Sequence, residues 1–192
     1  MGPLISRDVG AYWVAGILTV AAVAASISAA PGPLGLLGAA LALLMGAIAI
    51  ADLREFIIPN AATAPAFVLG LINSVIRDAP SLIEPVAFAA LRGVSLALMF
   101  FVLREIHGRL RRREGIGLGD VKLAGVAGVW LDWPTIPLAI EVAALAGLAA
   151  YLAVKITSGE PMRSTNRLPF GLFLAPAIWA GWMFEAMLRP WF

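Results

Sequence analysis

The sequence contains no cysteine, a single histidine (His107) and few charged residues, which make up 14% of its 192 positions. The lack of cysteine excludes disulfides, thiolate nucleophiles and cysteine-bound metals, and one histidine cannot form a zinc site alone. Soluble domains have about 25% charged and about 45–50% apolar residues. Here 61% of the residues are hydrophobic. The composition therefore indicates an integral membrane protein.

Long apolar runs predict an all-α fold, a polytopic membrane bundle of about seven transmembrane helices that forms a single domain over 1–192. Strands of a membrane barrel would instead alternate over about ten residues. The expected spans are 11–30, 34–51, 61–76, 85–104, 119–132, 136–156 and 168–188. The third and fifth are shorter than the about 20 residues that cross a bilayer. We therefore expect them to tilt, to thin the bilayer locally or to be buried among neighbouring helices.

The basic residues predict the orientation of these spans. Arginines lie at 104, 109 and 111–113, Arg54 follows the second span, and further Lys and Arg residues lie at 155–167. Such residues mark cytoplasmic connections, so we expect a multi-pass protein of the cytoplasmic (inner or plasma) membrane. The N-terminus would lie in the cytoplasm and the C-terminus outside. The net charge of +2 then reflects topology and contact with anionic lipid, and no nucleic-acid partner is expected.

The first apolar run also fits a signal peptide, because small residues in "SISAAPGP" could form a cleavage site. We expect the run to be retained as a span. Its removal would leave every later connection on the same side of the membrane.

Two carboxylates lie at the edges of expected spans. Asp52 closes the second span and Asp120 opens the fifth, so both are expected at cytoplasmic helix ends. Charged groups at membrane depth are costly and usually line a cavity or pathway. Two carboxylates that approach each other share a proton, and such a pair can activate water while polarising a peptide carbonyl. A structural role as helix cap or interfacial residue is the alternative for each.

Small residues surround Asp120. Gly117 and Gly119 lack side chains where a substrate or a neighbouring helix could come close, although an ordinary loop would also contain them. The small residues Ala124, Gly125 and Gly128 follow on the expected helix. They are typical of a face that packs tightly against another helix.

Three other charged residues lie within expected spans. Lys122 points about 200° away from Asp120, so we expect it to extend to the cytoplasmic interface, with a substrate or neighbouring-helix contact as the alternative. Arg92 lies about two turns inside the fourth span, where it could extend outward to the membrane surface or pair with Glu84 or a buried Glu141. The sequence assigns no function to Arg92 or Glu141.

Three segments resemble motifs of the type IV prepilin peptidases. "ADLREFIIPN", which contains Asp52, Pro59 and Asn60, is similar to their first active-site motif, an Asp followed by Ile-Pro and then Asp or Asn. "GIGLGDVKL" looks like their Gly-x-Gly-Asp-x-Lys motif, here Gly117 to Lys122. "NRLPFGLFLAPAIW" is similar to the Pro-Phe-Gly segment that opens their last helix. Order and spacing agree over roughly residues 35–188.

The resemblance implies an intramembrane-type aspartic endopeptidase with Asp52 and Asp120 as the catalytic pair. Its substrates would be prepilins or prepilin-like proteins of a type IV pilus or secretion system. The enzyme would remove their short basic leader at the cytoplasmic membrane face, and this mechanism requires no metal or cofactor. The resemblance does not identify the filament system or the oligomeric state.

The sequence departs from many bacterial members of that family. They carry a cytosolic insertion after the first helix, often with paired cysteines, that is linked to N-methylation of the cut pilin. Here only "PGPLG" joins the first two spans. The resemblance therefore implies the short form of the family, in which N-methyltransferase activity is not expected. Some relatives have an acidic residue at the position of Asn60. Because this position lies beyond the catalytic Asp, the difference does not argue against peptidase activity.

Helix position suggests separate roles for the two aspartates. Asp120 begins a helix, where the macrodipole favours the charged form, and Asp52 ends one, where the dipole disfavours it. Asp120 is therefore expected to be the base and Asp52 the proton donor, although a coupled pair titrates as a unit. Two other functions stay open. One is an intramembrane protease of the presenilin kind, and the other is a small transporter that moves protons or cations through Asp52 and Asp120.

Overall fold

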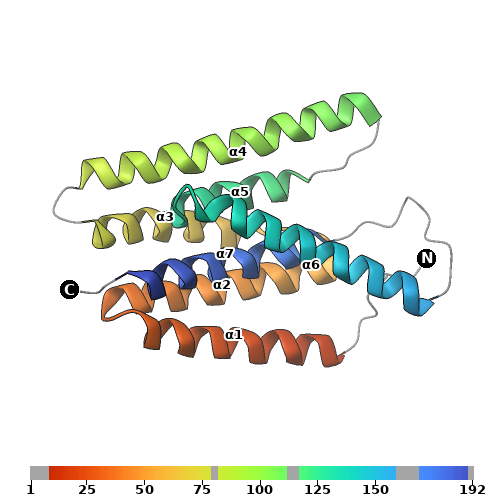
Figure 1. Cartoon of the computed structure of the whole chain (residues 1–192), viewed down its shortest axis with the longest axis horizontal. Helices are drawn as coiled ribbons and strands as arrows, with labels where there is room; N and C mark the ends of the chain where they lie inside the picture. The colour runs from red at the N-terminus through yellow and green to blue at the C-terminus, as the bar shows by residue number, and fades with distance from the viewer. Residues whose placement is uncertain (1–8, 79–81, 112–116, 159–168, 190–192) are drawn as a thin grey trace.

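A computed structural model describes residues 9–78, 82–111, 117–158 and 169–189. In these ranges the chain forms seven α-helices and no strand, which confirms the predicted all-α fold (Figure 1). The helices are α1 (Val9–Ala29), α2 (Pro33–Glu55), α3 (Asn60–Arg77), α4 (Ile83–Arg111), α5 (Leu118–Trp130), α6 (Thr135–Ser158) and α7 (Gly171–Leu188). Most helix ends lie within a few residues of the expected span limits. The exception is α4, which continues to Arg111.

Five helices, α1, α2, α4, α6 and α7, are long and apolar enough to cross a membrane. The short α5 has 13 residues, a length of about 20 Å. All of its residues from Leu123 to Trp130 are buried. Tilt, local thinning of the bilayer and burial were the arrangements expected for a short span, and α5 shows burial among neighbouring helices.

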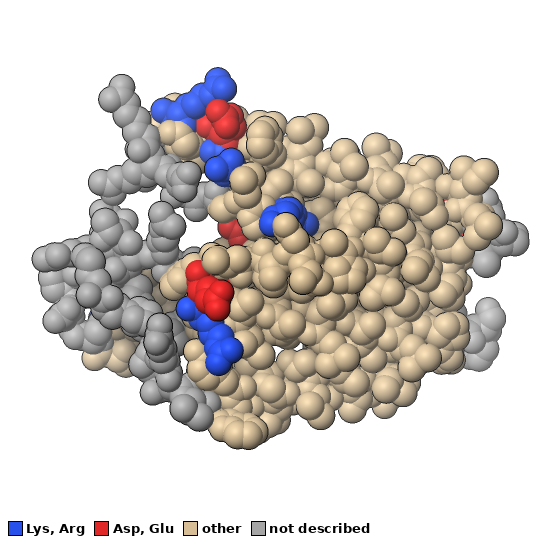
Figure 2. All heavy atoms as spheres, turned by 180° about the vertical axis from the view of Figure 1, so that it is seen from behind, with Lys and Arg blue, Asp and Glu red and all other residues tan. Residues whose placement is uncertain are grey.

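Consecutive helices run in opposite directions, so α1 begins and α7 ends at opposite ends of the bundle (Figure 1). We call the end where α2 ends and where α3, α5 and α7 begin the aspartate end, and the opposite one the far end. On the face drawn in Figure 2, charged side chains gather mainly at the aspartate end. Residues 112–113 and 159–168, whose charges contributed to the expected orientation, lie outside the described residues. The cytoplasmic position of this end stays a prediction.

Small residues allow α4 and α5 to approach closely. A Cβ added to Gly128 would lie 2.6 Å from the carbonyl oxygen of Arg92, and one added to Gly93 would lie 2.7 Å from Val129. The indole N–H of Trp130 donates a 2.7 Å hydrogen bond to the carbonyl oxygen of Ala66 on α3. The small-residue face predicted for this helix is thus confirmed at Gly128, and α5 is wedged between α3 and α4.

The expected partners of Arg92 were wrong. Its Nε donates to the carbonyl oxygen of Gly128 at 3.2 Å, and its guanidinium lies 3.7 Å from the carboxylate of Asp132. Glu84 and Glu141 are both exposed. Glu141 is therefore not buried as expected.

Gly128→Ala should destabilise the protein, because the new Cβ would collide with backbone atoms of α4 that cannot move independently. Overpacking of this kind costs about 1–3 kcal/mol. Thermal unfolding in detergent measures the effect, and Gly108→Ala is the matched control, since a Cβ there meets nothing within 4 Å. Equal melting temperatures for the two variants would contradict the close packing of α4 on α5.

Candidate active site

Asp52 lies in the last turn of α2, and its side chain is held by another helix. The residue is 5% exposed. Its Oδ2 accepts a 2.9 Å hydrogen bond from the backbone N–H of Leu172, and the N–H of Gly171 donates to the same carboxylate. Free N–H groups and the positive end of the dipole make a helix N-terminus a favourable position for a carboxylate. The start of α7 therefore fixes the orientation of Asp52.

Asp120 is in the first turn of α5. Its Oδ2 accepts a 3.1 Å hydrogen bond from the backbone N–H of Gly117, the residue that precedes the helix. This bond closes the turn over Gly117–Asp120 and leaves the side chain half-buried. Asp120 thus caps its own helix, whereas Asp52 caps a helix distant in sequence.

The side chain of Ile58 brings the two aspartate-bearing segments together. It is 6% exposed and packs between the first residues of α5 and α7. A Cβ added to Gly119 would lie 2.9 Å from Ile58, and one added to Gly171 would lie 2.8 Å from it. Asp52 and Asp120 consequently lie at the same end of the bundle, on segments that both contact the Ile58 side chain or its immediate neighbours. Among the described residues, no group of three His, Asp or Glu side chains could hold a metal ion.

The sequence analysis did not single out Ile58, Gly171 or Leu172 as site residues. Gly171 is the glycine of the Pro-Phe-Gly segment, and a Cβ there would lie 2.9 Å from Oδ2 of Asp52. Only glycine lets the start of α7 approach the carboxylate so closely. The Pro-Phe-Gly segment matches a family motif, but no feature of the sequence indicated that it contacts Asp52.

The predicted roles of Asp52 as acid and Asp120 as base rested only on the helix to which each residue belongs. In that picture Asp52 lies at the end of α2, where the helix dipole disfavours its charged form. The structure adds the start of α7, whose N–H groups favour the charged form of Asp52. Both carboxylates therefore receive backbone hydrogen bonds at a helix N-terminus, and helix position no longer separates their roles.

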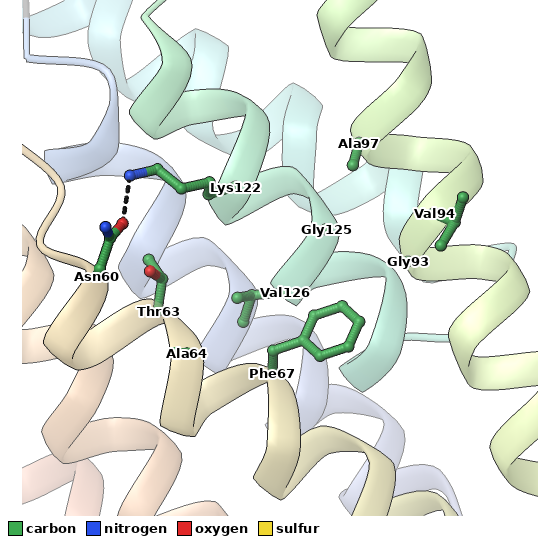
Figure 3. A pocket seen from close by; sticks show the side chains of 10 residues that line it. All are labelled: Asn60, Thr63, Ala64, Phe67, Gly93, Val94, Ala97, Lys122, Gly125 and Val126. Atoms are coloured by element: carbon green, nitrogen blue, oxygen red, sulfur yellow. Dashed lines mark hydrogen bonds between the residues drawn. The ribbon is translucent and has the colours of Figure 1, made fainter.

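Lys122 contacts a neighbouring helix, the alternative that the sequence left open. Its Nζ donates a 2.6 Å hydrogen bond to Oδ1 of Asn60, the first residue of α3, whose N-cap is Pro59 (Figure 3). The pair lies at one end of a cavity of about 330 Å³ between α3, α4 and α5. Because Asn60 and Lys122 follow the two aspartates in sequence, their bond ties the Asp52 segment to the Asp120 segment.

Comparison with known proteins identifies the family. A model of the type IV leader peptidase family matches residues 39–152, more than half of the chain. The chain belongs to this family. The match includes both aspartates of the candidate site, Asp52 and Asp120. The third motif, at the start of α7, lies beyond it.

Curated relatives carry the name prepilin leader peptidase/N-methyltransferase. The family member described here is 26% identical to one from Aeromonas hydrophila, over 88% of this chain and 57% of the relative. It is 33% identical to one from Burkholderia pseudomallei (strain 1026b), over 82% and 50%, and 35% identical to one from Dickeya chrysanthemi, over 64% and 42%. The chain spans about half the length of the curated relatives it matches. No solved structure matches it.

Asp52→Ala should loosen the start of α7, because Gly171 and Leu172 would lose their hydrogen-bond acceptor. Loss of a helix cap costs about 1 kcal/mol, so the amide of Leu172 should exchange its hydrogen several-fold faster. Asp52→Asn keeps an acceptor oxygen and should preserve most of the protection. Hydrogen exchange at the start of α7 provides the measurement, and equal protection in Asp52→Ala and the wild type would contradict the capping role.

Proposed function

We propose that the protein is an aspartic endopeptidase that removes the short basic leader from type IV prepilins or prepilin-like proteins. One observation carries the proposal: carboxylates from α2 and α5 converge at one end of a membrane bundle, where α7 holds one of them in place. Family membership and the names of the relatives support the same reaction. The predicted orientation puts this end at the cytoplasmic face, where a basic leader would remain.

In the proposed reaction, Asp52 and Asp120 together carry one proton. The ionised carboxylate takes a proton from water, whose oxygen attacks the carbonyl carbon of the scissile peptide bond. The protonated carboxylic acid gives its proton to the carbonyl oxygen, which yields a neutral tetrahedral intermediate. As this intermediate collapses, the aspartate that took the proton from water passes it to the peptide nitrogen, the other aspartate takes a proton from a hydroxyl of the intermediate, and the C–N bond breaks to give a carboxylic acid and an amine. The pair ends with one proton, as it began, so neither aspartate needs a fixed role.

Asparagine variants separate catalysis from helix capping, because Asn can still accept the backbone hydrogen bonds but cannot transfer a proton. We expect Asp52→Asn and Asp120→Asn each to slow leader removal at least about 100-fold. The measurement is the size of a prepilin co-expressed with the protein or incubated with it in proteoliposomes.

The matched control is Glu55→Gln, which neutralises an exposed carboxylate at the same end of α2. It should process the prepilin at the wild-type rate. Normal processing by either Asn variant would refute the two-aspartate mechanism, and absence of processing by the wild type would refute the assigned substrate.

We also propose that this chain cleaves without methylating its product. Only residues 30–32 connect α1 to α2, and the chain has no cysteine, so the insertion linked to methylation is absent at this position. Mass spectrometry of the mature pilin made in the presence of S-adenosylmethionine should show a free, unmethylated N-terminal amine. A methylated N-terminus formed by the purified protein would contradict this proposal.

A further inference from the structure

Charged side chains at the far end form a network that the proposed mechanism does not use. Arg77, the last residue of α3, lies 3.0 Å from Oδ1 of Asp132 and 3.4 Å from Oε2 of Glu185. The backbone N–H of Asp132 donates a 2.7 Å hydrogen bond to Oε1 of Glu185, which joins the end of α5 to α7 directly. Arg189 lies 2.7 Å from the second oxygen of Asp132 and 3.6 Å from Asp78. Three helix ends are thus tied together.

Burial makes the central contacts of this network strong. The side chains of Arg77 and Glu185 are each 10% exposed, so water screens their attraction little. Burial alone would raise the pKa of Asp132, but the charges of Arg77 and Arg189 outweigh it and hold this pKa below its ordinary value. Removal of one partner would leave another charge buried and unpaired, which is costly.

The network lies at the opposite ends of the helices that build the candidate active site. α5 carries Asp120 in its first turn and is followed by Asp132, about 18 Å away along the helix axis. α7 carries Leu172, which holds Asp52, and Glu185, about 20 Å away. The two distances are nearly equal. A contact between Asp132 and Glu185 at one end therefore brings Asp120 level with Leu172 and Asp52 at the other.

We propose that Arg77, Asp132 and Glu185 are positioning residues that set the register of α5 along α7, and through it the approach of Asp120 to Asp52. This proposal rests on the proposed peptidase function. No proline interrupts α5, so a slip of its end next to Asp132 moves Asp120 by a similar distance. Misplacement of a catalytic group by about 1 Å can cost about 100-fold in rate.

The test measures kcat and KM for leader removal by the purified, full-length protein in proteoliposomes with a prepilin. The wild type must cleave and Asp120→Asn must not; failure of these two conditions refutes the proposed function and not the network. Arg77→Gln should then lower kcat at least tenfold and change KM less than twofold, since the substrate does not contact the far end. Arg77→Lys keeps a cation and should recover most of the lost kcat.

Two further variants make the result decisive. Glu185→Gln retains an acceptor for the N–H of Asp132 but weakens the pairing with Arg77, so kcat should fall at least threefold with KM unchanged. Glu84→Gln neutralises an exposed carboxylate at the same end of the bundle and should leave both constants at wild-type values.

A merely structural network would give a different result. Folded Arg77→Gln protein with a lowered melting temperature but a wild-type kcat overturns the proposal, as does a raised KM with kcat unchanged. If Arg77→Gln does not fold, Glu185→Gln decides the question, and a wild-type kcat in that variant overturns the proposal.

Discussion

The carboxylate of Asp52 accepts hydrogen bonds from the first backbone N–H groups of α7, and the other features of the site depend on that contact. It joins α2 to α7, two helices that are distant in sequence. It requires glycine at position 171, because a Cβ there would lie 2.9 Å from the carboxylate oxygen. It also positions the start of α7 against Ile58, which in turn contacts Gly119 next to Asp120. One helix cap thus links the segments that carry the two aspartates.

Much of the fold could be predicted from the sequence, because the apolar runs and their breaks depend on local residue order. The seven helices, the short length of α5 and the position of Asp52 and Asp120 at helix ends all follow from such runs. Hydropathy does not tell which helices are neighbours, since in a membrane protein nearly every helix face is apolar. The contact of Asp52 with α7 could therefore not be predicted, and the roles assigned from single-helix dipoles lacked it.

The charges at the far end show the same limitation. Arg77, Asp132 and Glu185 belong to three segments, and in the sequence each has only local neighbours. The sequence analysis predicted no network among them, and it paired Arg92 with the wrong carboxylates. The partners of these charged residues depend on which helix ends meet. That arrangement depends in turn on the packing of Gly128 against α4 and of Trp130 against α3. Partners across a bundle are a property of the packing and not of spacing along the chain.

The unequal lengths of α4 and α5 determine how far Asp120 lies from the end of α4. The two helices touch where Gly128 meets Arg92. From there α4 continues for about 28 Å to Arg111, while α5 extends only about 12 Å to Asp120. Asp120 is therefore recessed by more than 10 Å below the tip of α4. In the proposed reaction, a substrate that approaches from the side of α4 passes the last turns of that helix before it reaches Asp120.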